Sequence, residues 1–400
     1  MPGRRCILAG MGTIITASEF DERRQRAGAM ARAAGLDGLV VCSRGGGTLD
    51  RFADVFWLTG FYTQFPYIPD VAGNWSGRAH AIALVKPTGE TRLIVDVPSW
   101  TNVSLPDERI SFADFVTEAA VKAVAEEFGP AARLGLVGED TMPASMYRAL
   151  TNALPGIELL GVQDAFNGLK AVKSPGEIEL LRRASELGSR ATDAVMAAAR
   201  AGMNHGDALS AAMNVLLPAR AILYNAFIRS GTGGPAPRFV RSALPTWGSS
   251  ETLEDGEFLC AGLSGVLDGY YFDLARCRPV GRVSNAMIDC FESTIAVVEA
   301  GIAAAQSGAT GEQVMQAGSA RQAELGFPKS GNFQGFGHGI GLGWDDPWLA
   351  PGVKMKLEPG MVICVEKWLM RDGYAGDYED TILITPGGNE KITDAQVRWW

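Results

Sequence analysis

The feature that most constrains this chain is a set of ligand-type side chains in its C-terminal third: three carboxylates inside or beside apolar runs and one histidine in a glycine-rich turn. His338 lies in the Gly-His-Gly turn of GFGHGIG, Glu366 ends the run MVICVE, Glu379 stands in GDYEDTILIT, and Asp273 lies upstream in GYYFDLAR. An unpaired carboxylate in an apolar run is costly. One imidazole together with carboxylates is a donor set that binds divalent cations. The pattern therefore predicts a fold that brings the four side chains to one buried cation.

The first 165 residues alternate between helix and strand patterns. Residues 18–34 read as an amphipathic helix capped by Ser18, and residues 80–96 read as a hairpin around Pro-Thr-Gly. The other expected elements are strands at 36–43, 134–138 and 157–162 and helices at about 116–128 and 143–153. This alternation predicts an α/β domain, and we find no catalytic group of residues in it.

A helix start marks the entry to a second domain. In Ser174-Pro175-Gly176-Glu177, the serine is an N-cap, the proline fits the first helical position and the glutamate completes a capping box. We expect one domain over 1–168 and another over 169–400. In the second we expect helices at 175–201, 207–216, 284–305 and 310–325, and strands at 222–229, 257–265, 268–276, 361–367 and 378–385. Helices beside such strands predict an α+β layer.

Composition narrows the class of partner. A chain of 400 residues that is 47% hydrophobic can bury a large core. Its net charge of -9 disfavours nucleic acid and anionic membranes as partners. No apolar run of about eighteen residues is present, so no membrane-spanning helix is predicted. The cysteines show no CxxC spacing and several lie in apolar runs, so we expect buried thiols and a cytoplasmic protein.

These motifs resemble those of the pita-bread family, which includes methionine aminopeptidase, Xaa-Pro aminopeptidase, prolidase and creatinase. Residues 38–61 resemble the start of a creatinase-type N-terminal domain, and residues 172–177 resemble the entry to the catalytic domain. The resemblance implies an α/β N-terminal domain, a pita-bread catalytic domain, and a homodimer in which the partner's N-terminal domain closes the site. It also matches four residues to the last four of the peptidases' five metal ligands: Asp273, His338, Glu366 and Glu379.

The chain departs from the peptidase pattern at the first metal ligand. The peptidases have an additional Asp eleven residues before the one that matches Asp273. Counted without gaps, Gly262 stands there, and with a longer hairpin it is Cys260. Neither is a hard oxygen ligand, and Asp268 is the nearby carboxylate that could partly substitute. In the family geometry this loss empties one metal position and spares the other, so a single ion is expected.

Two further departures fall on residues that contact substrate in the peptidases. Arg238 stands where a histidine follows a Ser-Gly stretch. Arginine cannot act as a base near neutral pH, but it can grip an acidic group. Asp345 stands where another histidine polarises the scissile carbonyl. We expect Asp345 to act as a proton shuttle or to recognise a cationic amine.

The resemblance and these departures from it together imply a small-molecule hydrolase that cleaves a C–N bond with one divalent ion, which is manganese, zinc, iron or cobalt. Glu366 or Glu379 would handle protons, and Arg238 would bind an acidic substrate group. Three alternatives remain: an Xaa-Pro peptidase, a metal-free creatinase-like hydrolase or lyase, and a binding module without catalysis.

Overall fold

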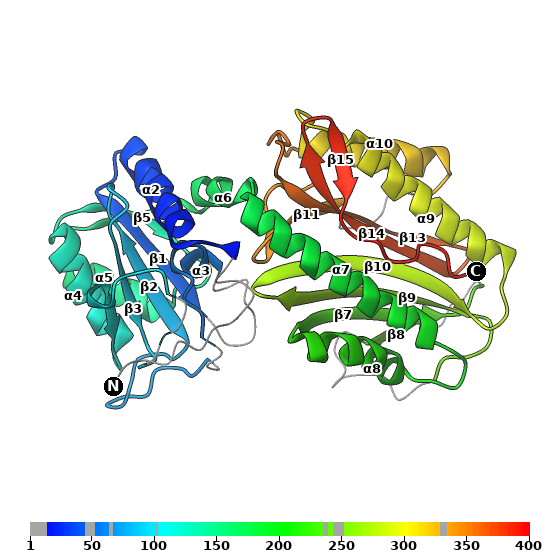
Figure 1. Ribbon diagram of the computed structural model, residues 1–400, viewed down its shortest axis with the longest axis horizontal. Coiled ribbons are helices and arrows are strands. Elements are labelled where there is room, and N and C mark those ends of the chain that lie inside the picture. Colours follow the sequence, from blue (N-terminus) through cyan, green and yellow to red (C-terminus); the bar gives the residue numbers. More distant parts are fainter. Residues whose placement is uncertain are drawn as a thin grey trace. The chain divides into compact units, whose positions relative to one another are not determined.

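The computed structural model describes residues 14–44, 53–63, 67–98, 100, 103–234, 239–242, 252–328 and 334–400. The chain divides into two compact units, Met1–Lys170 and Ala171–Trp400. This division falls two residues beyond the boundary expected from the sequence. Each unit has its own sheet and its own core (Figure 1).

The first unit is a six-stranded mixed sheet with helices. Its strands are β1 (Gly38–Arg44), β2 (His80–Val85), β3 (Thr91–Val95), β4 (Ile110–Phe112), β5 (Arg133–Val137) and β6 (Glu158–Gly161), in the order β4-β3-β2-β1-β5-β6. Its helices are α2 (Ala17–Ala33), α3 (Ala53–Thr59), the 3-10 turn η2 (Asp107–Arg109), α4 (Val116–Phe128), α5 (Ala144–Ala153) and α6 (Gln163–Ala171). Thr16, not Ser18, caps α2, because its hydroxyl accepts from the backbone N–H of Glu19.

The second unit begins with the expected capped helix. The Ser174 hydroxyl accepts from Glu177 N, and the Glu177 carboxylate accepts from Ser174 N. Its helices are α7 (Pro175–Ala198), α8 (His205–Leu216), the 3-10 turn η3 (Leu217–Ala219), α9 (Asn285–Ala304) and α10 (Gly311–Glu324).

A nine-stranded antiparallel sheet forms the body of the second unit. Its strands are β7 (Ile222–Gly231), β8 (Phe239–Ser242), β9 (Glu257–Leu267), β10 (Tyr270–Val280), β11 (Gly337–Ile340), β12 (Trp344–Asp345), β13 (Val362–Arg371), β14 (Tyr374–Thr385) and β15 (Gly388–Lys391). Their order is β12-β11-β13-β14-β10-β9-β7-β8, with β15 paired to β14. Because strand side chains alternate between faces, every second residue is available for a site.

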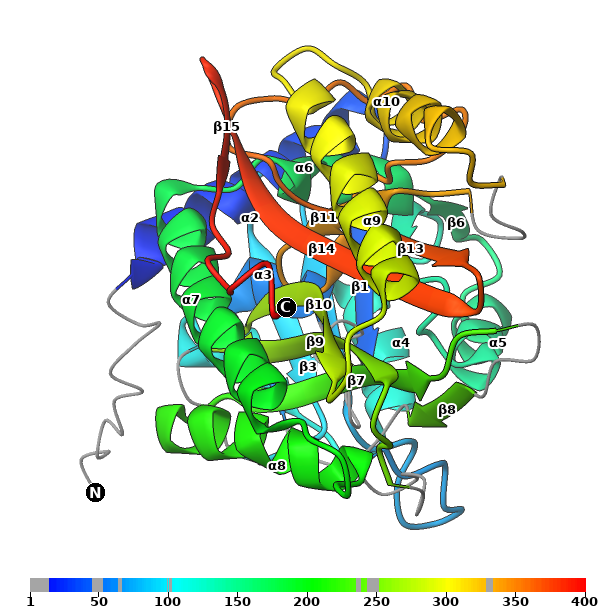
Figure 2. The same cartoon turned by 90° about the vertical axis from the view of Figure 1, so that its right-hand side faces the viewer.

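The helices of the second unit cover one face of this sheet (Figure 2). Helices α7 and α8 pack on β7, β9 and β10 in one apolar cluster. Helices α9 and α10 pack on β13 and β14 in another. The opposite face of these strands is therefore left to line a pocket.

His338 differs from its sequence interpretation, because it lies in strand β11 and not in a turn. The glycines on either side are required by close packing. A Cβ on Gly337, whose φ is +127°, would fall 2.0 Å from the carbonyl oxygen of Cys364. A Cβ on Gly339 would fall 2.3 Å from the carbonyl oxygen of Asp346. A side chain at either position would clash with these carbonyl oxygens, so the Gly-His-Gly motif allows β11 to pack closely against its neighbours.

The cysteines also differ in part from expectation. Cys42, Cys290 and Cys364 are buried free thiols, as the sequence predicted. Cys260 and Cys277 face each other on β9 and β10 and form a disulfide, so the expectation of free thiols is wrong for these two. Among the described residues, no helix has the length and apolar character required to cross a membrane.

Candidate metal centre and substrate pocket

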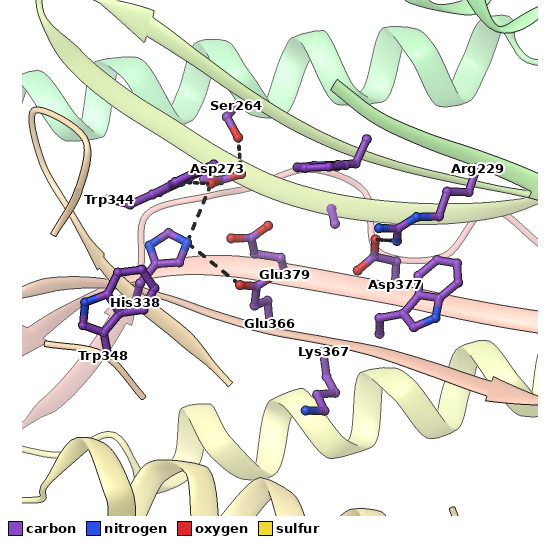
Figure 3. Close-up of a pocket in the computed structure, with 14 residues that line it drawn as sticks. Arg229, Ser264, Asp273, His338, Trp344, Trp348, Glu366, Lys367, Asp377 and Glu379 are labelled. Carbon is purple, nitrogen blue, oxygen red and sulfur yellow. Dashed lines mark hydrogen bonds and ion pairs between the residues drawn. The ribbon is translucent and has the colours of Figure 1, made fainter. Parts of the chain in front are cut away.

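A pocket of about 610 Å³ opens on the face of the large sheet that the helices leave free. The four predicted ligands line it together (Figure 3). The lining residues are Phe227, Arg229, Gly262, Ser264, Asp273, Ala275, His338, Trp344, Trp348, Glu366, Lys367, Trp368, Asp377 and Glu379.

Strand register explains why residues far apart in sequence meet. Ala275 on β10 pairs with Glu379 on β14, and Glu379 pairs with Glu366 on β13. Asp273 lies two residues along β10 from Ala275, on the same face. The pocket side chains therefore form neighbouring rows that run across the strands.

Asp273 is held by two donors. The Ser264 hydroxyl donates to its Oδ1 at 2.8 Å, and the Trp344 indole N–H donates to its Oδ2 at 2.7 Å. The side chain is only 8% exposed. Burial raises the pKa of this carboxyl, although these donors and His338 oppose the shift.

His338 presents one ring nitrogen to the carboxylates. Its Nδ1 lies 2.9 Å from the carbonyl oxygen of Gly339. A carbonyl can only accept, so Nδ1 carries the proton and Nε2 keeps its lone pair. Nε2 lies 3.8 Å from Asp273 Oδ2 and 3.9 Å from Glu366 Oε1. The ring is thus oriented as a metal ligand before any ion binds.

Glu366 and Glu379 face each other across β13 and β14. Desolvation raises the pKa of Glu366, and the charge of Asp273 adds to this effect. Burial raises the pKa of Glu379 well above its ordinary value, and Asp273, Glu366 and Asp377 push it in the same direction. These carboxylates repel one another when they are ionised, and a cation bound between them would offset this repulsion.

The donor set fits a divalent cation. Glu379 Oε1 is buried and accepts no hydrogen bond from the described residues, which leaves an oxygen that an ion would satisfy. Two held ligands, Asp273 and His338, lie beside it. Oxygen atoms with one imidazole nitrogen suit manganese, zinc, iron and cobalt alike.

Cys364 is an additional candidate ligand that the sequence did not indicate. Ligand atoms of His338, Cys364 and Glu379 all lie within 4.8 Å of one another. However, the Cys364 thiol is fully buried and lies 3.4 Å from the Thr381 hydroxyl. Burial and the charges of nearby carboxylates raise its pKa well above the ordinary value, so the thiolate form that binds metals is disfavoured.

Arg229 and Asp377 lie on the other side of Glu366 and Glu379 from His338 (Figure 3). Arg229 Nη1 lies 3.4 Å from Asp377 Oδ2. The guanidinium carbon stacks 4.1 Å from the ring centre of Trp368. Burial raises the pKa of Asp377 to about 7, and Arg229 opposes this shift. No motif in the sequence indicated either residue.

The residues that line the pocket indicate which of them stands at the position of the missing first ligand. Gly262 lines the pocket, opposite Ala275 on β10 and Phe227 on β7. Cys260 lies two residues before Gly262 on β9 and is fully buried in its disulfide. Asp268 sits in the β9–β10 hairpin with a φ of +50° and pairs with Arg183 at 3.5 Å. Neither Cys260 nor Asp268 lines the pocket, and Gly262 brings no donor.

The structure does not bring Asp345 to the predicted ligands. Its strand neighbour Trp344 lines the pocket, and alternation turns Asp345 to the other face. A Cβ on Gly341 would lie 2.8 Å from Asp345 Oδ2 and 3.2 Å from Lys173 Cε, which places the carboxylate beside Lys173. The catalytic role expected of Asp345 is therefore not supported by geometry. Arg238 lies outside the described residues.

Two families match the chain. Residues 179–386 match metallopeptidase family M24, and residues 23–172 match the creatinase/prolidase N-terminal domain. The chain is 26% identical to a creatinase of a Bacillus species, over 72% of this chain and 73% of that protein. It is 25% identical to an Xaa-Pro dipeptidase of Pyrococcus horikoshii, over 64% of this chain and 72% of that protein.

Solved structures share the architecture of both units. The dipeptidase PepE of Mycobacterium ulcerans superposes with a TM-score of 0.77 at 21% identity. The match covers 96% of this chain and 98% of that chain. At this level of identity the likeness supports the fold and leaves the chemistry to the residues of the pocket.

Proposed function

Because the chain belongs to metallopeptidase family M24 and is a hydrolase that acts on C–N bonds, we propose that it cleaves an amide bond in a small molecule with a single divalent ion. Asp273, His338, Glu366 and Glu379 would hold that ion. The observation that carries the proposal is the unsatisfied, buried Glu379 Oε1 beside an imidazole nitrogen that is already turned toward it and its neighbours. Gly262, which offers no ligand at the pocket wall, supports one ion over two.

A divalent ion bound there would supply Lewis acidity that polarises the amide carbonyl. The chain supplies the proton transfers. Glu366 is the most exposed of the predicted carboxylate ligands, at 32%, so an incoming water reaches it more readily than it reaches Asp273 or Glu379. We assign to it the acceptance of a proton from the attacking water and the delivery of that proton to the leaving amine.

The remaining residues hold geometry. Ser264 and Trp344 fix the Asp273 carboxylate through their hydrogen bonds. The carbonyl of Gly339 fixes the imidazole of His338. The indole rings of Trp344 and Trp348 flank His338 at 5.7 and 5.8 Å and narrow the access of water to it. The hydrogen bonds to Asp273 and His338 are of the kind that commonly sets the affinity for the ion.

The test combines metal content, binding and activity. Purified protein is stripped with a chelator, reloaded separately with manganese, zinc, iron or cobalt, and assayed on a panel of dipeptides and N-acyl amino acids. We expect one ion per chain and activity that returns with at least one metal. Glu379→Gln should weaken ion binding and abolish activity.

Asp377→Asn is the matched control, because it neutralises another buried carboxyl on the same strand and should leave one ion per chain bound. Stripped protein that keeps its full activity would favour metal-free hydrolysis. A wild-type chain that binds no ion would overturn the proposed centre.

We also propose that the chain acts as a homodimer, which the family resemblance supports, and that it works in the cytoplasm. Three buried free thiols support the cytoplasmic proposal, whereas a disulfide such as Cys260–Cys277 is rare in cytosolic proteins. Light scattering on the purified protein tests the dimer, since a monomeric mass at working concentrations contradicts it.

A further inference from the structure

The pocket contains a cationic side chain that the proposed hydrolysis does not use. Arg229 lies on β7, where it pairs with Cys260 of β9, and Cys260 pairs with Cys277 of β10. Asp377 on β14 donates its backbone N–H to Cys277 Sγ and pairs with Trp368 on β13. These five residues form one row across the sheet, next to the row that holds Glu366 and Glu379.

Curvature of the sheet brings the two ends of this row together. Four steps between neighbouring strands would span about 19 Å in a flat sheet. Yet the guanidinium carbon of Arg229 reaches to 4.1 Å from the Trp368 ring centre. The Arg229 side chain therefore crosses the pocket above the disulfide of Cys260 and Cys277.

The donors of Arg229 are only partly used. Its Nη1 contact with Asp377 Oδ2 is long, at 3.4 Å, and hydrogen bonds of this type usually fall between about 2.7 and 3.2 Å. Among the described residues, no other polar contact to its guanidinium is found. The side chain lines the pocket and is 25% exposed. Stacking on Trp368 fixes the plane of the guanidinium and leaves its remaining N–H groups for a ligand.

We propose that Arg229 anchors a carboxylate of the substrate. A planar fork of N–H groups held by an aromatic ring matches a planar carboxylate and binds it through two parallel hydrogen bonds. This inference rests on the proposed function for the claim that the anchored molecule is also hydrolysed. Arg229 would then bind the acidic substrate group that, from the sequence, Arg238 is expected to bind.

The spacing of the rows limits the length of that substrate. Asp377 lies two residues along β14 from Glu379, and same-face side chains two residues apart are separated by about 7 Å. The carboxylate that binds Arg229 must then lie within a few bonds of the C–N bond that is cleaved. The substrate class is an N-acyl amino acid or a dipeptide, in which one carbon separates the amide nitrogen from the carboxylate.

Binding to metal-free protein tests the anchor apart from activity. Calorimetric titrations compare N-acetylglycine with N-acetylglycinamide, which differ at the carboxylate. We expect wild-type protein to bind the acid roughly tenfold to hundredfold more tightly than the amide, the range for hydrogen bonds to a charged group. Arg229→Gln should remove this difference, and Arg229→Lys should keep only part of it. Arg282→Gln, a change at an exposed arginine paired with Asp255, should leave it intact.

Kinetics on reloaded enzyme separate this inference from the proposed function. Ala-Pro and Ala-prolinamide serve as the substrate pair, and Arg229→Gln should raise KM for the dipeptide alone. Equal wild-type binding of acid and amide, or a preference for the acid that survives in Arg229→Gln, would refute the anchor. Arg229-dependent binding of the acid without hydrolysis of any panel substrate would instead refute the proposed function and leave the anchor standing. Circular dichroism of each variant shows whether it is folded.

Discussion

Replacing Gly262 by aspartate should convert a one-ion pocket into a two-ion pocket. A Cβ at this position would lie 3.7 Å from Ala275 Cβ and 3.8 Å from Phe227 Cβ, which are ordinary contacts. The side chain therefore fits without displacing the sheet. Ala275 separates it from Glu379 along the row, and Asp273 lies on the diagonal. An aspartate there would add the oxygen ligand that the chain lacks.

The expected size of the effect follows from mass action. When the free ion concentration is a hundred times the dissociation constant, binding stabilises the folded state by about 2.7 kcal/mol. A domain of the size of the unit Ala171–Trp400 gains about 2–4 °C in Tm per kcal/mol. Filling a second site should thus raise Tm by roughly 5–10 °C beyond the wild-type response to metal.

The metal-free variant should behave in the opposite way. The new carboxyl joins Asp273, Glu366 and Glu379, whose pKa values burial already raises. A carboxyl with a raised folded-state pKa contributes stability below its unfolded pKa and loses it as pH rises. Metal-free Gly262→Asp should therefore lose stability relative to wild type as pH rises from 5 to 8.

Calorimetric titration gives the number of ions per chain, and differential scanning calorimetry gives Tm with and without metal. Gly262→Ala is the control, since it fills the same space without charge and should still bind one ion. A Gly262→Asp chain that binds only one ion would show that Gly262 is not the missing ligand position. A wild-type chain that binds two ions would show that the pocket never lacked one.

Three further changes test individual contacts. Asp380→Ala should lower the free energy of unfolding in urea by about 3–5 kcal/mol, because it leaves the buried Arg276 guanidinium without the carboxylate that pairs with it at 2.6 Å. Asp255→Ala, at an exposed pair, should lower it much less. Ser174→Ala should cost about 0.5–2 kcal/mol in the same assay, because it removes the capping box of α7, and an unchanged midpoint would contradict this role. Trp344→Phe should weaken ion binding by roughly 10- to 100-fold in calorimetry, because Asp273 loses its indole donor, whereas Trp348→Phe should retain the wild-type affinity.

The sequence predicted most of the regular structure because its signals were local. The capping box at Ser174 located the start of α7. The family predicted from the motifs, with a creatinase-type domain before a pita-bread domain, is confirmed by the matches to both. The four predicted ligands share a pocket. Asp273, Glu366 and Glu379 could be recognised in the sequence because each is a carboxylate inside or beside an apolar run.

The misses depend on register and curvature, which no local pattern encodes. In the sequence, Arg229 next to Ser230 resembles an ordinary arginine of a solvent-facing strand. Only the curvature of the folded sheet places it beside Asp377. Trp344 reads as loop, yet it donates to Asp273 across the pocket. Asp345 stands at the position of a substrate-contacting histidine in the family, but alternation along β12 turns its neighbour Trp344 to the pocket.

Charge among the described residues that line the pocket does not by itself choose between one ion and two. Four carboxylates face it: Asp273, Glu366, Asp377 and Glu379. Arg229 lies beside Asp377, whereas Lys367 points away from the carboxylates and donates to the carbonyl oxygen of Gly335 (Figure 3). With His338 neutral as a ligand, full ionisation leaves three negative charges. One divalent ion leaves one negative charge and two ions leave one positive charge, so charge excludes neither number. The ligands decide it: Gly262 supplies no oxygen for a second ion, which becomes favourable only if the chain supplies another carboxylate.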